Sequence, residues 1–292
     1  MKKGTAIAGL VLVTIIWGGG FIASDMALES MGPFQIMMVR FLLAALLMGV
    51  FSINVLKTIT KEEIIAGSLM GVALFTAFAL QIVGLQYTTP SKNAFLTSLN
   101  VVIVPFIAFI ILKKKVGAKG IAGAVLSVIG VAVLSLQGNF TLGLGDALTL
   151  VCAVGFAFQI FLTSECVKKF RVPVLNCVQM TVSFILSVFG MLIFKETHFQ
   201  ITTKGCLSVI YLGAVSTALC YLIQTICQKY VDETKAAIIL SMEAVFGTVF
   251  SVIILHEVIT FRMVVGSLII LTAVIISNLS ETSGSQEVVE EQ

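Results

Sequence analysis

The chain is built from apolar runs of about 20 residues separated by short polar stretches. Strands of a membrane barrel alternate apolar and polar residues over about ten positions, and these runs are continuously apolar. A helix needs about 20 apolar residues to cross a bilayer, so each run predicts one spanning helix. The sequence therefore predicts an all-α integral membrane protein with ten transmembrane helices, at about 4–23, 34–53, 64–85, 93–112, 119–136, 145–165, 173–194, 205–227, 236–256 and 262–279.

The composition excludes the soluble classes of protein. Of the 292 residues, 58% are hydrophobic and 11% are charged, whereas about 25% charged residues is usual in soluble domains. So few charges cannot cover a globule of this size with polar surface, which excludes a water-soluble enzyme and a nucleic-acid-binding protein. The six cysteines lie in or beside apolar runs without a CxxC spacing. This pattern favours buried apolar side chains and predicts neither a disulfide nor a metal site.

The positions of Lys and Arg predict how the chain is threaded. With ten spans and both termini in the cytoplasm, only four of the 18 Lys and Arg residues lie outside, and Arg40 lies within a helix. Because cytoplasmic loops carry an excess of Lys and Arg, we expect the N and C termini to lie in the cytoplasm. The expected location of the protein is the plasma membrane, which is the inner membrane of the cell. The acidic, Ser-rich stretch 280–292 is expected to be a disordered cytoplasmic tail. The four outside residues are Lys92, Lys195, Lys204 and Arg262.

The second half of the chain repeats the first. An offset of 143 residues superimposes the third to fifth apolar runs on the eighth to tenth, and an offset of 141 pairs the first with the sixth more weakly. Each unit holds five helices, an odd number, so the second unit enters the membrane from the opposite side. We therefore expect two inverted repeats, at 1–136 and 145–279, with a crevice between them near the middle of the membrane. The matches include Gln81 with Gln224, Tyr87 with Tyr230, Lys92 with Lys235 and Ser98 with Ser241.

Four stretches have a recognisable order and spacing: 16–21 (IWGGGF), 40–47 (RFLLAALL), 94–112 and 240–257. Together they resemble the ten-helix branch of the drug/metabolite transporter superfamily, which carries paired EamA domains. The resemblance covers nearly the whole chain, and it implies inward termini, a central cavity lined mainly by the first, third, fourth, sixth, eighth and ninth helices, and efflux or exchange of small metabolites.

This sequence departs from the family pattern at two places. Lys114 replaces an acidic residue that is usual after the fourth helix, and Ala244 replaces a proline that often follows the glutamate of the ninth helix. The first change is expected to weaken a structural contact. The second predicts a less kinked ninth helix with a regular backbone near Glu243.

Two ionisable residues lie within the predicted spans, where a charge costs about 2.5–3.5 kcal/mol on insertion scales. Glu243 lies about 10 Å into the ninth helix. If the Glu243 carboxyl gains and loses a proton as the cavity opens to one side of the membrane and then to the other, it couples proton movement to transport. The alternative is that Glu243 is a neutral glutamate with a structural role. Arg40 cannot lose its charge, and by depth its expected partners are Asp25 or Glu29. We interpret Arg40 as a structural clamp, with a gate or a contact to a substrate anion as alternatives, and an ion pair with Glu243 is disfavoured by depth.

Polar and aromatic residues of the cavity helices are candidate substrate contacts. Gln81 and Gln224 are repeat equivalents, as are Asn100 and Glu243, so each pair would lie symmetrically about the crevice. A single polar residue can equally join two helices, for about 0.6 kcal/mol, but as a set they predict a polar or zwitterionic ligand. Trp17 is a candidate to stack on a ligand, with Gly18–Gly20 letting the helix bend. The alternative is a tryptophan at the membrane interface and glycines that serve close helix packing. Pro105 removes an amide donor from the fourth helix and is a candidate hinge or gate. The candidate contacts are Trp17, Gln81, Thr97, Ser98, Asn100, Gln159, Ser216, Tyr221, Gln224, Ser241 and Glu243.

The leading hypothesis is a secondary active transporter that moves a small polar metabolite or drug, such as an amino acid, by alternating access. It would export or exchange this substrate, with the proton as candidate coupling ion. No Walker A, HExxH or GxSxG motif occurs, so we expect no enzyme activity and no cofactor. A lipid-modifying membrane enzyme and a non-transporting assembly subunit are the alternatives. The expected partners are the substrate and the lipid bilayer, without nucleic acid, and the chain is expected to be a monomer or a weak homodimer.

Overall fold

The computed structural model describes residues 1–113, 117–135, 142–200, 202–231 and 233–278. Lys114 and the tail 280–292 therefore lie outside the described residues. The described chain is all-helical and has no strand. Its helices are α1 (Lys3–Leu28), α2 (Pro33–Leu56), α3 (Lys61–Leu85), α4 (Pro90–Thr97), α5 (Asn100–Leu112), α6 (Ala118–Ser135), α7 (Leu144–Cys166), α8 (Val172–Ile193), α9 (Thr203–Ile210), the π-helical segment η1 (Tyr211–Leu219), α10 (Cys220–Gln228), α11 (Glu233–Leu240), α12 (Glu243–Leu255) and α13 (Phe261–Asn278).

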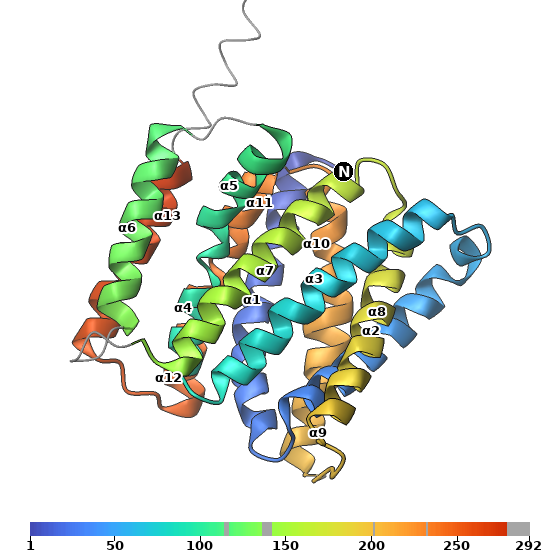
Figure 1. Ribbon diagram of the computed structural model, residues 1–292, viewed down its shortest axis with the longest axis horizontal. Helices are drawn as coiled ribbons and strands as arrows, with labels where there is room; N and C mark the ends of the chain where they lie inside the picture. Colours follow the sequence, from blue (N-terminus) through green and yellow to red (C-terminus); the bar gives the residue numbers. More distant parts are fainter. Residues whose placement is uncertain (114–116, 136–141, 201, 232, 279–292) are drawn as a thin grey trace, which may run out of the picture.

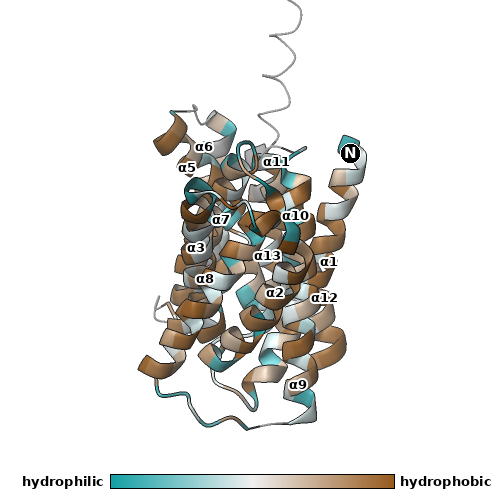
Figure 2. Cartoon of the chain, turned by 90° about the vertical axis from the view of Figure 1, so that its right-hand side faces the viewer, coloured by the Kyte–Doolittle hydropathy of each residue, from teal (hydrophilic) through white to brown (hydrophobic). Residues whose placement is uncertain are grey.

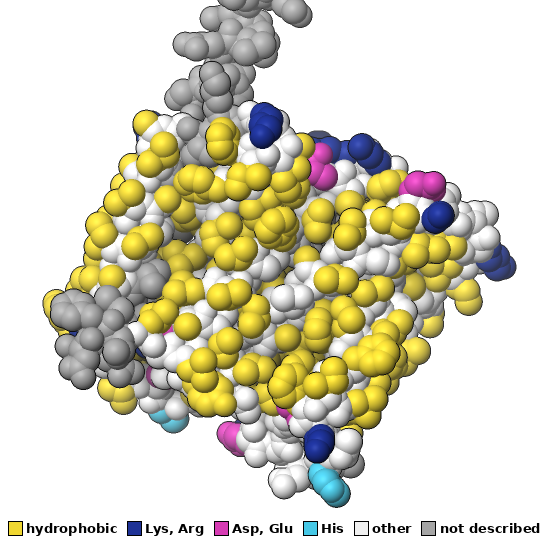
Figure 3. All heavy atoms as spheres, viewed as in Figure 1, with side chains coloured by type: hydrophobic (Ala, Val, Ile, Leu, Met, Phe, Trp, Pro, Cys, Tyr) yellow, Lys and Arg dark blue, Asp and Glu magenta, His cyan; other side chains and the backbone are white. Residues whose placement is uncertain are grey.

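Within the described residues, eight helical stretches are long and apolar enough to cross a membrane, and shorter apolar helices occupy Ile121–Gly130 and Phe261–Ala273. Those two lie in α6 and α13, which have 18 residues each. A helix of that length measures about 27 Å, slightly less than the hydrocarbon core of about 30 Å. Hydrophobic side chains cover the flank of the bundle, and hydrophilic residues lie mainly toward its two ends (Figures 2 and 3). The chain is thus a multi-pass membrane protein.

Successive membrane-crossing stretches of the chain run in opposite directions between the two ends of the bundle (Figure 1). We call the end where α1, α3, α8 and α11 begin the N end, and the opposite end the α9 end. α6 packs along α13 at one edge, and α2 packs along α8 at the other. The contacts occur in matching pairs: α3 packs on α7 as α10 packs on α1, and α5 packs on α7 as α12 packs on α1.

Two spans are broken at equivalent positions. α4 gives way to α5 at residues 98–99, and α11 gives way to α12 at residues 241–242, an offset of 143. At each break a serine hydroxyl donates to the carbonyl three residues earlier, Ser98 to Phe95 and Ser241 to Ile238, both at 2.7 Å. Such bonds compete with the helical ladder. The expectation of a regular backbone near Glu243 is therefore wrong, because the break does not depend on a proline at position 244.

Close helix contacts are made by glycines. A Cβ on Gly67 would lie 2.6 Å from the Cβ of Val178, and one on Gly71 would lie 2.8 Å from the carbonyl oxygen of Gln179. Both glycines therefore let α3 approach α8 within one chain, as small residues commonly do in membrane helices.

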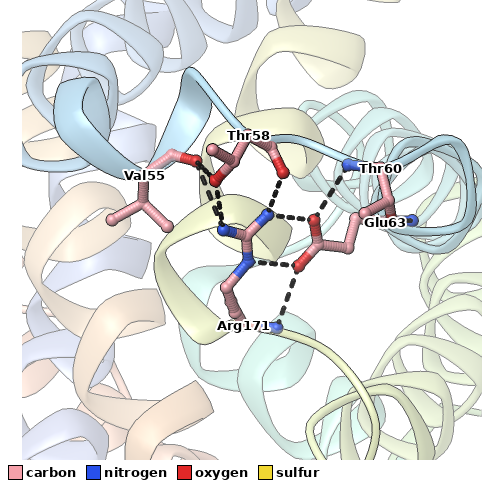
Figure 4. Close-up of polar contacts among 5 residues, drawn as sticks. All are labelled: Val55, Thr58, Thr60, Glu63 and Arg171. Atoms are coloured by element: carbon pink, nitrogen blue, oxygen red, sulfur yellow. Dashed lines mark hydrogen bonds and ion pairs between the residues drawn. The ribbon is translucent and has the colours of Figure 1, made fainter.

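Arg171, the residue before α8, ties the α2–α3 connection to α8 at the N end (Figure 4). Its Nε and Nη2 donate to the two carboxylate oxygens of Glu63 at 2.7 and 2.5 Å, and Nη1 and Nη2 donate to the hydroxyl and carbonyl of Thr58. Glu63 also closes a capping box with Thr60 at the start of α3. The Glu63 side chain is only 4% exposed, so its charge depends on this arginine.

A second contact joins the same helices at the α9 end. The Glu196 carboxylate, in the α8–α9 connection, accepts from the backbone N–H groups of Phe34 and Gln35 at 2.8 and 3.2 Å. The Gln35 amide donates back to the carbonyls of Glu196 and His198. Partial burial raises the pKa of the Glu196 carboxyl, and the two backbone N–H groups oppose that rise. α2 and α8 are therefore held together at both ends.

We expect Arg171→Gln to lower the melting temperature in detergent by about 4 °C or more, because it leaves the Glu63 carboxylate buried without its bidentate partner. Glu63→Gln should also destabilise the protein, and the double variant should lose less than the sum of the two single losses. Lys168→Gln is the control, since it removes an exposed ion pair with Glu165 that contributes little. Equal shifts for Arg171→Gln and Lys168→Gln would contradict the assigned role.

Candidate functional site

A cavity lies between α1, α3, α7, η1, α10 and the two helix breaks. Its enclosed volume, as seen by a water-sized molecule, is about 40 Å³, and the whole space among its lining atoms, open solvent included, is about 580 Å³. It reaches from the breaks toward the α9 end, where Ser24, Leu85 and Asn93 line it. Eight residues singled out from the sequence are among its lining: Trp17, Arg40, Gln81, Asn100, Gln159, Ser216, Tyr221 and Glu243.

The other candidates do not line this cavity. Thr97 stands directly behind the lining, where its hydroxyl accepts from the Gln81 amide at 3.2 Å. Ser98 and Ser241 bond to their own helices at the breaks. Pro105 lies inside α5, which continues through it, so the interruption of this span is at residues 98–99 and not at the proline. The remaining candidate, Gln224, is fully buried in α10.

Glu243 is the first residue of α12 and is 6% exposed. Among the described residues, no hydrogen bond or ion pair involves its carboxyl group. Asn100 holds the equivalent place at the start of α5, and its Oδ1 is buried without a partner. The two breaks therefore bring an acid and an amide, each with unused bonding capacity, to the same cavity.

Arg40 projects into the interior and is 3% exposed. Its Nε donates to the Thr217 hydroxyl, and its Cζ lies 3.9 Å from the centre of the Phe78 ring. The predicted pairing with Asp25 or Glu29 is wrong: Glu29 binds Lys204 at 2.6 Å, and no carboxylate of the described residues comes within ion-pair distance of Arg40. The position of Arg40 along α2 did not show the direction of its side chain, which extends toward Thr217 and Phe78 and away from the acids at the α9 end. Its positive charge is therefore held by a hydroxyl and an aromatic face.

Aromatic rings form one wall of the cavity beside Arg40. The Trp17 and Tyr221 rings lie 5.1 Å apart, and the Phe78 ring lies 5.0 Å from Phe156 and 6.3 Å from Tyr221. The indole N–H of Trp17 donates to the carbonyl of Ser216 at 2.7 Å. Trp17 thus belongs to the cavity wall and not to an interfacial belt, and its ring is held in a fixed position.

Sequence reasoning missed Asn93, Ser24 and the phenylalanines of the wall. The Asn93 amide donates to the Gln81 carbonyl and the Thr149 hydroxyl, while its Oδ1 is buried without a partner. Its repeat equivalent is Ala236, so the internal repeat contains no signal for it. Together with Asn100 Oδ1 and Ser216 Oγ, three unpartnered polar atoms line the cavity. A buried polar atom left unbonded costs about 1–3 kcal/mol, which indicates a ligand that offers hydrogen bonds.

The glycines that follow Trp17 bring α1 against its neighbours. A Cβ on Gly18 would lie 2.6 Å from the Cβ of Phe246 and 2.8 Å from the backbone nitrogen of Gly247 in α12, and one on Gly20 would lie 3.0 Å from Ser216 Oγ. α1 is continuous through these residues. The glycines therefore serve close packing beside the cavity and not a bend.

We expect Gly18→Ala to destabilise the protein by about 1–3 kcal/mol, because the new methyl group meets backbone as well as side-chain atoms and α1 must move away from α12. Gly49→Ala is the matched control: it lies in α2 with no atom within 4 Å of the added carbon, and it should leave stability unchanged or raise it slightly. Thermal unfolding in detergent measures both. Similar melting temperatures for the two variants would show that the α1–α12 contact is not tight.

Comparisons with known proteins agree with this architecture. The profile of the EamA-like transporter family matches the chain twice, over residues 4–136 and 143–279. An "Uncharacterized transporter" of Archaeoglobus fulgidus is 34% identical over 279 residues, which cover 96% of this chain and 87% of that protein. The "Probable amino-acid metabolite efflux pump" of Escherichia coli is 26% identical over 91% of this chain and 92% of its own length.

A solved crystal structure has the same fold. It superimposes with a TM-score of 0.72 over 95% of this chain and 99% of its own, at 13% sequence identity. At that identity the likeness concerns the fold alone.

Proposed function

Because this multi-pass membrane transporter belongs to the EamA-like transporter family, we propose that it is a secondary active transporter for a small zwitterionic metabolite, such as an amino acid. It exports or exchanges this substrate across the plasma membrane by alternating access. The observation that carries the proposal is one cavity lined by a buried base and a buried acid, Arg40 and Glu243, neither of which has an oppositely charged partner among the described residues.

A zwitterion complements these two groups. Its carboxylate matches the guanidinium of Arg40, which forms strong paired hydrogen bonds with such groups, and its ammonium group matches the carboxylate of Glu243. The aromatic wall of Trp17, Phe78 and Tyr221 suits an apolar side chain. The family relative named as an amino-acid metabolite efflux pump agrees with this class of substrate.

Alternating access requires two halves that can exchange roles. The two family matches, the paired helix contacts and the equivalent breaks at 98–99 and 241–242 support a division into inverted repeats at 1–136 and 145–279. In this arrangement α6 and α13 are the fifth and tenth spans. Lysines and arginines gather at the N end (Figure 3), which supports cytoplasmic termini.

Glu243 is the proposed coupling residue. A buried carboxyl without a partner is most stable when it carries a proton or meets a cation. A proton and the ammonium group of the substrate would therefore compete for the same oxygen atoms. A site that holds one or the other, and never both, exchanges substrate for protons across the membrane.

We expect Glu243→Gln to reduce both substrate-dependent proton flux and tracer counterflow of the zwitterionic substrate about tenfold or more, because a neutral amide neither exchanges a proton nor offers a negative charge to the ammonium group. The measurement uses proteoliposomes with an internal pH probe and a panel of amino acids, purines, polyamines and cationic drugs. Glu257→Gln is the control: this acid binds Ser91 and Ser251 outside the cavity. Wild-type proton flux in Glu243→Gln would remove Glu243 from coupling. A wild-type protein that moves no compound in either assay would favour an assembly subunit.

We expect Arg40→Gln to weaken the binding of phenylalanine about tenfold or more and to leave phenylethylamine, which lacks the carboxylate, nearly unaffected. Competition against tracer counterflow measures both, and Arg40→Lys provides a second variant that keeps the charge. Equal losses for both compounds, or a lower melting temperature without a change in selectivity, would assign Arg40 to structure alone.

A further inference from the structure

Two buried glutamines of α10 have polar atoms that bond to nothing in the described part of the chain. Gln224 is fully buried, and both its Nε2 and its Oε1 lack a partner. Gln228 donates to the Ile160 carbonyl and the Ser164 hydroxyl, but its Oε1 is also unpaired. These atoms lie in the half of the bundle toward the N end, and none belongs to the cavity described above. Residues that only join helices would be bonded, so these glutamines need partners that this arrangement does not supply.

A chain of polar side chains leads from the cavity to Thr225, which follows Gln224 in α10. Gln159 lines the cavity, and its amide donates to Thr163 and to the Gln179 side chain at 3.2 Å. Gln179 in turn donates to Asn176 at 3.4 Å. The Thr225 hydroxyl lies 3.2 Å from the same Asn176 oxygen and has its shorter bond, 2.6 Å, to the Tyr221 carbonyl of its own helix. All five side chains are almost completely buried. A closed polar layer between α7, α8 and α10 therefore continues from the cavity toward the N end.

The internal repeat relates this layer to the cavity. Phe78, Gln81, Ile82 and Leu85 form one face of α3, and all four line the cavity. At the offset of 143 their equivalents on α10 are Tyr221, Gln224, Thr225 and Gln228, of which only Tyr221 lines it. The same helix face thus lines the cavity in the first repeat, on α3, and is mostly buried outside the cavity in the second repeat, on α10. The two sets differ in chemistry, because Ile82 and Leu85 are apolar and Thr225 and Gln228 are polar.

We propose that Gln224, Thr225 and Gln228 form the second half of the substrate path, a polar site at the N end that is closed in this structure. In the opposite state of the transporter, the α3 face is buried by its neighbours and the α10 face lines an open path. The unpaired amide groups of Gln224 and Gln228 then bond to a hydrogen-bonding solute and to water. Separation of Thr225 from Asn176, and of Gln159 from Gln179, opens the layer. This inference rests on the proposed transport function and adds residues that the cavity of this structure does not contain.

Single cysteines test the path by their reactivity toward a membrane-impermeant, positively charged methanethiosulfonate, applied to sealed vesicles from the N-end side or from the α9 side. We expect Thr225→Cys and Gln228→Cys to react from the N-end side alone, and Ile82→Cys from the α9 side alone. Saturating leucine and phenylalanine on both membrane faces should change the reaction rate of the α10 cysteines and that of Ile82→Cys in opposite directions, by about threefold or more. The protein with its native cysteines gives the background, and Ala44→Cys, in the apolar core of α2, should stay unreactive.

The outcomes separate this inference from the proposed function. Thr225→Cys and Gln228→Cys proteins that fold, transport substrate and yet react from neither side would overturn the second half-site and leave the transporter in place. Reaction of Thr225 and Ile82 variants from the same side would also overturn it. Reaction of Thr225→Cys from the N-end side in a protein that moves no compound would support the opening of this path and contradict the proposed substrate class.

Discussion

A helix inside a membrane must keep its backbone groups bonded even where its geometry changes, because lipid offers them no hydrogen bonds. The breaks at 98–99 and 241–242 meet this condition with tighter turns, in which Val101 N–H donates to Ser98 and Ala244 N–H donates to Ser241. The two breaks also lie together, since α4 packs on α12 and α5 packs on α11. They set Asn100 and Glu243 at the start of two half-helices inside the bundle. The position of the cavity, and the placing of an acid within it, follow from this constraint.

The polar groups of the interior fall into two classes. Those that are bonded hold helices together, as Arg171 and Glu63 do at the N end and Glu196 does at the α9 end. Those that are not bonded lie mostly in the cavity or in the layer behind it, with Ser127 Oγ in α6 and Glu257 Oε1 as exceptions. An unmade hydrogen bond in a dry interior is expensive, so the second class marks where a solute is needed. This distinction, more than polarity itself, separates structure from function in the interior.

The errors of the sequence analysis have physical causes. A break of two residues leaves an apolar run unchanged, so hydropathy did not detect the interruption beside Glu243. A helix that is apolar on every side does not reveal which face points inward. For this reason the candidate contacts included four residues that do not line the cavity, Arg40 was given the wrong partners, and Asn93 was missed. The four are Thr97, Ser98, Gln224 and Ser241.

The sequence by itself determined the all-helical membrane class, the family and the presence of a buried acid and a buried base, because the length of apolar runs and the cost of charge in lipid are properties of the chain alone. The alignment at offset 143 also placed Gln81 opposite Gln224 and Asn100 opposite Glu243. Only the tertiary structure decided that Gln81 lines the cavity while Gln224 does not, and that the Arg40 charge rests on Thr217 and Phe78. Those facts depend on how the two halves of the chain pack against each other, and this packing is made by helices that are distant in the sequence.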